Sequence, residues 1–197
     1  MIAYKGFTEN LWSKHGNGEK ETCSFKIGET KTVDESKTVR SGFHCCENPF
    51  ECLTYYAFDG KNRFFKVLAA GDIDEDENER IACTQITLLE ELTPVRFAME
   101  GLKYMIHHPQ RHNWEQSYDS VQVRQNRASV EKEGHIAIAR GRDPRVRGPE
   151  GSILGLLVEK DGEILNAKLI RVGPTYADKW LRLTEERKVE IIEKGKG

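Results

Sequence analysis

The stretch Ser41-Gly-Phe-His-Cys-Cys-Glu-Asn-Pro-Phe50 combines a glycine, a histidine, two adjacent cysteines and a helix-start signal. Asn48 is a residue type that caps helices, and Pro49 suits a first helical turn, where the missing backbone N–H costs nothing. An apolar run follows at residues 64–69 and predicts a buried strand. We therefore expect the N-terminal half to fold around a strand-to-helix corner, a place where mixed α/β domains often hold ligands.

The composition is that of an ordinary soluble protein. The 197 residues can form one large domain or two small ones, with 38% hydrophobic and 31% charged residues. The net charge of −2 gives no general attraction to nucleic acid or membranes. No apolar run approaches the roughly 18 residues of a membrane span, and the N-terminus lacks the pattern of a signal peptide. We expect neither a membrane nor a nucleic-acid partner.

The cysteines indicate a reduced chain. All five lie in the N-terminal half, an odd number without any C-x2-C pair, which disfavours a disulfide scaffold and a zinc site. Core packing is the expected role of Cys45, Cys46 and Cys52, and a nucleophilic Cys45 or Cys46 is the alternative. We predict a reduced, cytosolic chain.

Two clusters raise the question of a metal. Residues 72–79 are acidic and alternate like a calcium loop, but the required glycine is missing and Cys83 stands where the last glutamate belongs, so a solvated loop is expected. His107, His108 and His112 lie close together without a carboxylate or cysteine at ligand spacing, and histidine commonly ends helices. We predict no metal and no cofactor.

The second half combines one helix with short apolar segments. Thr93-Pro94 is another helix start, and apolar residues recur at helical spacing up to Pro109. Residues 120–123, 135–139 and 152–157 are apolar, lie about 15–17 positions apart and are separated by turns. Such repeats are typical of a small β-solenoid or roll, with residues 164–172 and 180–183 as capping strands and a homo-oligomer as one way to cover its ends.

These patterns predict an α+β fold. Residues 1–95 form a mixed α/β domain with the central corner, residues 96–118 form a linking helix and loop, and residues 119–197 form the β-solenoid or roll. A cluster of guanidinium groups in the repeat turns, beside aromatic and basic residues of the linking loop, predicts a site for an anionic ligand. Its members are Arg111, His112, Trp114, Tyr118, Arg140, Arg142, Arg145 and Arg147. A solvated, charged sheet edge is the alternative.

Several segments resemble an uncharacterised domain family common in phage and prophage proteins. They are Tyr4-Lys-Gly6, residues 25–28, the GFHxCENP-type segment at residues 41–49, Tyr55-Tyr56 and Arg63-Phe64. Members often continue into short repeats, which residues 134–151 and 161–172 resemble. The resemblance covers most of the chain and implies a phage or prophage origin, with the bacterial cytoplasm as workplace, but it implies no activity.

The order of motifs also has a looser similarity to ADP-ribosyltransferase-like folds. That similarity places Lys5 near the first motif, Ser41 or His44 near the second, and Glu90 or Glu91 near the third. Lysine is a poor substitute for the rigid fork of an arginine, and no Q/E-x-E motif is present.

Three functions follow as hypotheses. The first is a phage-encoded accessory protein for counter-defence, which sequesters a small anionic molecule such as a nucleotide immune signal. The second is an enzyme acting on NAD or a related nucleotide, with His44, Ser41 and Glu91 as its catalytic residues. The third is a structural or interaction module. We rank binding first because the sequence shows no convincing catalytic set.

Overall fold

The computed structural model describes residues 1–13, 23–38, 40–75, 80–111, 114–184 and 186–192. The chain divides into two units, Met1–Thr93 and Pro94–Gly197, and each is described by itself. The elements of the first unit are β1 (Ile2–Phe7), β2 (Trp12–Ser13), β3 (Cys23–Ser24), β4 (Thr30–Thr32), β5 (Phe43–Cys46), the 3-10 helix η1 (Pro49–Thr54), β6 (Arg63–Glu75) and β7 (Arg80–Glu91).

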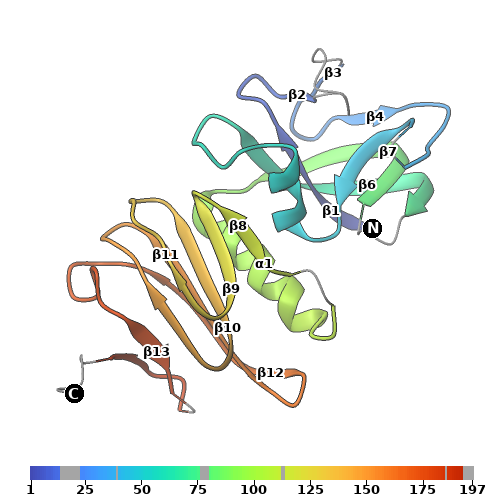
Figure 1. Ribbon diagram of the computed structural model, residues 1–197. Helices are drawn as coiled ribbons and strands as arrows, with labels where there is room; N and C mark the ends of the chain where they lie inside the picture. The colour runs from blue at the N-terminus through green and yellow to red at the C-terminus, as the bar shows by residue number, and fades with distance from the viewer. Residues whose placement is uncertain (14–22, 39, 76–79, 112–113, 185, 193–197) are drawn as a thin grey trace. The chain divides into compact units, whose positions relative to one another are not determined.

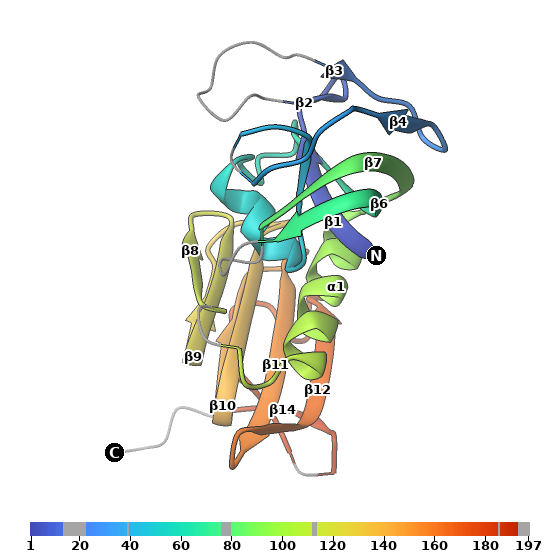
Figure 2. The same ribbon diagram turned by 90° about the vertical axis from the view of Figure 1, so that its right-hand side faces the viewer.

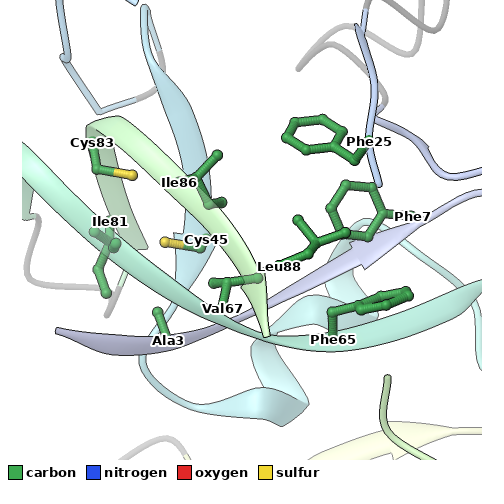
Figure 3. Close-up of a cluster of buried hydrophobic side chains, with 11 residues drawn as sticks. Ala3, Phe7, Phe25, Cys45, Phe65, Val67, Ile81, Cys83, Ile86 and Leu88 are labelled. Atoms are coloured by element: carbon green, nitrogen blue, oxygen red, sulfur yellow. The ribbon is translucent and has the colours of Figure 1, made fainter. Parts of the chain in front are cut away.

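Four of these strands close into a barrel. β1 pairs with β5 and β6, and β7 pairs with the same two strands, so that the ring β1-β5-β7-β6 has no open edge, while β4 adds to β7 (Figure 1). Its interior holds a cluster of apolar side chains that includes Phe7, Phe25 and Phe65 (Figure 3). Phe7 contacts the other two rings at centroid distances of 5.0 and 5.5 Å.

The helix start predicted at the corner is confirmed, although the helix is short and of the 3-10 type. The Asn48 side chain accepts a hydrogen bond from the backbone N–H of Phe50, and Pro49 stands in the first turn. Phe50, Cys52 and Leu53 are buried. The corner is therefore packed with its own side chains.

One side chain inside the barrel is charged. Ala3, Lys5 and Phe7 alternate along β1 and so face the same side, which is the barrel interior. Lys5 is 6% exposed, and its Nζ donates to the backbone oxygen of His44 over 2.6 Å. Its ammonium also lies 5.4 Å from the centre of the Phe7 ring. Lys5 is thus held as part of the core.

The second unit is one sheet with a helix on it. Its elements are α1 (Pro94–His107), β8 (Gln116–Tyr118), β9 (Val121–Ser129), β10 (Ile136–Arg147), β11 (Ile153–Lys160), β12 (Glu163–Arg171), β13 (Leu181–Leu183) and β14 (Val189–Ile191). α1 lies beside β11 and β12 (Figure 2). At Gly155 of β11 an added Cβ would lie 2.8 Å from Ile138 and 3.0 Å from Leu102 of α1, so the helix needs a glycine there to approach.

The predicted α+β fold with a β-solenoid or roll is wrong, because the chain is mostly β, with 53% of residues in strands against 11% in helices. In the first half, β6 extends through the acidic residues 72–75 that were predicted to be loop, because their pairing with β7 satisfies the backbone. In the second half, β9, β10 and β11 pair in parallel. The turn at Asp161-Gly162, with φ of 54° and 83°, then reverses the chain, and β12 returns antiparallel to β11 instead of adding another coil.

Candidate functional site

The ends of three strands in the second unit share one solvent-facing side. Ala128 of β9, Val146 of β10 and Leu181 of β13 are buried in the same apolar cluster. Because side chains alternate along a strand, the neighbouring arginines must point to the opposite side. Arg127, Arg145 and Arg182 are accordingly all exposed.

Strand register brings these arginines side by side. Arg145 pairs with Arg127 on one side and with Arg182 on the other. Neighbouring strands lie about 4.8 Å apart, so the three residues form a row across β9, β10 and β13, which we name the arginine row. Like charges directly opposite each other destabilise a sheet, so this row needs compensating groups or a bound anion.

Two acids compensate part of the charge. Asp143 Oδ2 accepts from Nε and Nη2 of Arg145, over 3.1 and 2.6 Å. Glu190 of β14 accepts from Nε and Nη2 of Arg182 in the same way, over 3.2 and 2.9 Å. Each acid occupies one edge of its guanidinium. Within the described residues, no hydrogen bond engages the remaining Nη1 of either arginine.

Arg127 has a different kind of support. Its guanidinium carbon lies 3.8 Å from the centre of the Trp180 ring, a distance at which cation and ring are in contact. Arg127 forms no ion pair with an acid among the residues that the structure describes. Arg147 follows Arg145 on the same side of β10. Four arginines therefore lie on this face, and among the described residues two acids, Asp143 and Glu190, form ion pairs with them.

Arg140, placed in the ligand site by the sequence, is instead a packed residue. It is 2% exposed, its Nε donates to Glu159 over 2.7 Å and its Nη2 donates to the backbone oxygen of Pro109. Its guanidinium carbon also lies 5.0 Å from the Trp114 ring centre. Arg140 thereby fastens the segment after α1 to β10 and β11, and Trp114 has its aromatic face occupied.

The other predicted ligand-binding residues are dispersed. Arg142 is exposed and pairs loosely with Asp161, with a closest N–O distance of 3.8 Å. Arg111 follows α1, and Tyr118 ends β8, where its backbone oxygen accepts from Gln122. His112 lies outside the described residues. Of the predicted set, the structure brings only Arg145 into the arginine row, with Arg147 beside it on the same face of β10.

Arg127, Trp180 and Arg182 were missed by the sequence analysis. A local signal did exist: Arg127 precedes buried Ala128, and Arg182 lies between two buried leucines, which is the alternation of an outward strand position. What the sequence did not contain was the register that aligns positions 127, 145 and 182.

The residues of the enzyme hypothesis do not meet. His44 of β5 pairs with Ala82 of β7, whereas Glu91 lies nine positions further along β7. Glu91 pairs there with Phe65 of β6, so His44 and Glu91 lie in different strand pairings of β7. Glu91 instead binds Arg63 through both carboxylate oxygens, over 2.7 and 2.5 Å. Ser41 lies in an isolated bridge with Lys37.

The thiols are packing groups. Cys45 and Cys83 both point into the barrel (Figure 3). A hydrogen bond with Cys83 and, as the second cause, burial raise the pKa of the Cys45 thiol. The same hydrogen bond lowers the pKa of the Cys83 thiol. A hydrogen bond with Cys46 and burial likewise raise the pKa of Cys52. Buried thiols of raised pKa are weak nucleophiles, which favours the core role of Cys45 and Cys52.

Among the described residues, histidine, cysteine and acidic side chains form no group of three or more that could hold a metal ion. The acids of the suspected calcium loop bind locally instead, as Asp74 accepts from the backbone and hydroxyl of Thr38. In the same described part of the chain, no helix has the length and apolar character that crossing a membrane requires.

Comparison with known proteins identifies the first half of the chain. Residues 1–100 match a family described as a domain of unknown function, DUF7666. The chain belongs to this family. The match spans the whole barrel unit and ends within α1, so the arginine row lies outside the DUF7666 domain. Neither the curated proteins nor the solved structures contain a match to this sequence.

Proposed function

We propose that this DUF7666 protein binds and sequesters a small phosphate-bearing ligand, of the nucleotide class, on the arginine row. The observation that carries this proposal is the register that places Arg127, Arg145 and Arg182 side by side. A sheet gains nothing from three adjacent like charges, whereas an anion lying across them relieves the repulsion. Guanidinium groups are suited to this role because their planar donors match phosphate oxygens.

The proposal includes a biological setting. A phage-encoded accessory protein that removes a nucleotide immune signal needs affinity without turnover, which suits a face built mainly of arginines. The phage origin rests on the sequence resemblance, and it would place the protein in the cytoplasm of a bacterial host. Enzyme action on NAD gains no support from the arrangement of His44, Ser41 and Glu91.

Self-association is the second part of the proposal. β12 stands at the end of the strand order of its sheet, so one of its edges has no partner strand among the described residues. Leu165 on this strand is 51% exposed. Pairing between two β12 edges would satisfy the backbone groups and cover this side chain. Sedimentation of the full chain, alone and with Leu165→Lys, tests for an oligomer that the charge disrupts.

The binding test compares two arginine variants. Adenosine triphosphate is titrated into the full chain and into the double variant Arg145→Ala/Arg182→Ala, and binding is measured by calorimetry. Two lost charge-assisted contacts of about 1.5 kcal/mol or more each predict a fall in affinity of at least a hundredfold. Arg142→Ala is the matched control, because it removes an exposed arginine of the same strand that lies outside the row.

The outcomes separate the hypotheses. Loss of binding in the double variant alone, with an unchanged circular dichroism spectrum, supports the proposal. If Arg142→Ala weakens the binding of adenosine triphosphate equally, the loss reflects net charge and not the arginine row. If the protein binds no nucleotide, the interaction-module hypothesis replaces the binding hypothesis. Asp143 and Glu190 then only neutralise the charge of a solvated face.

A further inference from the structure

We infer that Arg127, held over the ring of Trp180, forms the subsite for the aromatic base of the ligand, separate from the arginines that hold its phosphates. This inference rests on the proposed function and assigns its parts to particular residues. Arg145 and Arg182 each engage an acid in the plane of the guanidinium, as expected for groups that donate hydrogen bonds to anions. Arg127 differs from both, since its contact is with an aromatic face.

The stack with Trp180 prepares Arg127 for a second ring. At 3.8 Å from the ring centre, the guanidinium carbon is at contact distance from the indole, and Trp180 is itself half-buried. A side chain fixed in this way has already lost much of the rotamer freedom that an arginine normally loses on binding. Arg127 remains exposed, so its side away from the indole is accessible to a ligand.

A nucleobase is the chemical group that fits this surface. Guanidinium planes stack on bases, and every base has a π-face, so stacking does not depend on a hydrogen-bonding pattern. A base on Arg127 would extend the Trp180–Arg127 stack by one layer. Arg145, on the next strand at about 4.8 Å, and Arg182 beyond it would then face the phosphates of the same molecule.

This arrangement distinguishes a nucleotide from a bare polyphosphate. Inorganic tripolyphosphate offers the charge of a nucleoside triphosphate but no ring, so it would use Arg145 and Arg182 and gain nothing from the stack. A nucleotide would use both parts of the face. The Trp180–Arg127 stack therefore determines the selectivity for ligands with a base, while the remainder of the row supplies a general attraction for phosphate.

The experiment titrates adenosine triphosphate and inorganic tripolyphosphate, without divalent cations, into the full chain and its variants. Arg127→Lys keeps the positive charge but removes the planar fork, and Trp180→Leu removes the ring that supports it. Both variants should bind adenosine triphosphate about tenfold more weakly, the usual size of one base-stacking contact, with tripolyphosphate binding unchanged. Arg142→Lys, outside the row, should leave both affinities unchanged.

The pattern of results identifies which statement fails. If Arg127→Lys lowers neither affinity, or lowers both equally, Arg127 is not a base subsite, although binding by Arg145 and Arg182 stands. If the native chain binds neither probe, or if Arg145→Ala/Arg182→Ala binds both normally, the proposed function fails and this inference fails with it. If Trp180→Leu unfolds the sheet, the decision rests on Arg127→Lys, whose side chain is exposed.

Discussion

Arg140 and Arg145 lie five positions apart on β10 and show how the surroundings of an arginine decide its role. Arg140 is 2% exposed and donates to a carboxylate and a backbone oxygen while lying over an aromatic ring. Arg145 is exposed, contacts one acid and has an arginine on each neighbouring strand. The first directs its Nε and Nη2 donors to its own chain. The second keeps an exposed guanidinium whose Nη1 forms no hydrogen bond with the described residues.

The difference arises at the middle of β10. The pairing of β9 with β10 is regular up to Arg140, shifts before Arg145, and resumes there. Asn126, with a φ of 60°, stands opposite the shift on β9, in the left-handed conformation that asparagine tolerates. The irregularity separates the covered part of the strand from the part whose alternate side chains are exposed. One strand thereby carries both a structural and a solvent-exposed arginine.

The largest effect is expected from Arg140→Ala. The substitution leaves the Glu159 carboxylate and the Pro109 carbonyl without their donor, and breaking a buried ion pair commonly costs 3–5 kcal/mol. The Glu159 side chain is 27% exposed and stays partly hydrated. We therefore expect the substitution to lower the free energy of unfolding by about 3 kcal/mol. Urea unfolding followed by tryptophan fluorescence measures this loss.

Arg142→Ala is the matched control for Arg140→Ala. Its guanidinium is 82% exposed and its acid partner is 75% exposed, so removing it should change stability by less than about 0.5 kcal/mol. Similar losses in both variants would contradict the distinction between a structural and an exposed arginine. A folded Arg140→Ala protein should still bind the ligand of the arginine row.

Local signals in the sequence predicted local structure well. The cap at Asn48, the buried strand at residues 64–69 and the helix that begins at Pro94 all depend on neighbouring residues, and all three are present. The four-stranded barrel was not predicted, because closure depends on β7 pairing with both β5 and β6 across long sequence separations. The reversal into β12 was also missed, although Asp161-Gly162 is a typical hairpin turn.

The candidate site could be predicted only in part for the same reason. Four nearby arginines in the sequence suggested one cluster, yet Arg140 is buried, and Arg142 lies inside the register shift, where it has no paired position on β9. The residues that complete the row, Arg127 and Arg182, are distant in sequence from Arg145. Burial and register are properties of the folded sheet, and neither follows from the spacing of charges along the chain.

A smaller effect is expected when Arg145 is released from its acid. Asp143→Asn removes the charge that occupies the Nε and Nη2 edge, and an exposed ion pair is worth up to about 1 kcal/mol. We therefore expect the affinity for adenosine triphosphate to rise, by up to about fivefold, as measured by calorimetry. Asp161→Asn is the control, since it releases Arg142 outside the row. Equal gains in both variants, or a loss in Asp143→Asn, would argue against direct competition between Asp143 and the ligand.

The smallest effect concerns Glu91, the acid that the enzyme hypothesis assigned to catalysis. The hydrogen bond from Arg63 lowers the pKa of Glu91 below its ordinary value of 4.5, so the folded state favours the charged carboxylate. The stability gained in this way is fully present above about pH 4.5 and is lost as the pH falls through the lower value of the folded state. The two side chains are 32% and 40% exposed, so solvent screening limits the pair to about 0.5 kcal/mol.

Glu91→Gln should therefore lower the free energy of unfolding slightly at pH 7, and the difference from the native chain should vanish in acid. A double-mutant cycle with Arg63→Gln, measured by urea unfolding at both pH values, isolates the pair from the other contacts of each residue. The coupling should also weaken at high salt, because the pair is exposed. A coupling energy of several kcal/mol that does not change with salt would make the Arg63–Glu91 pair equivalent to the buried pair Arg140–Glu159. Exposure would then no longer explain why Arg140 and Arg145 of β10 differ.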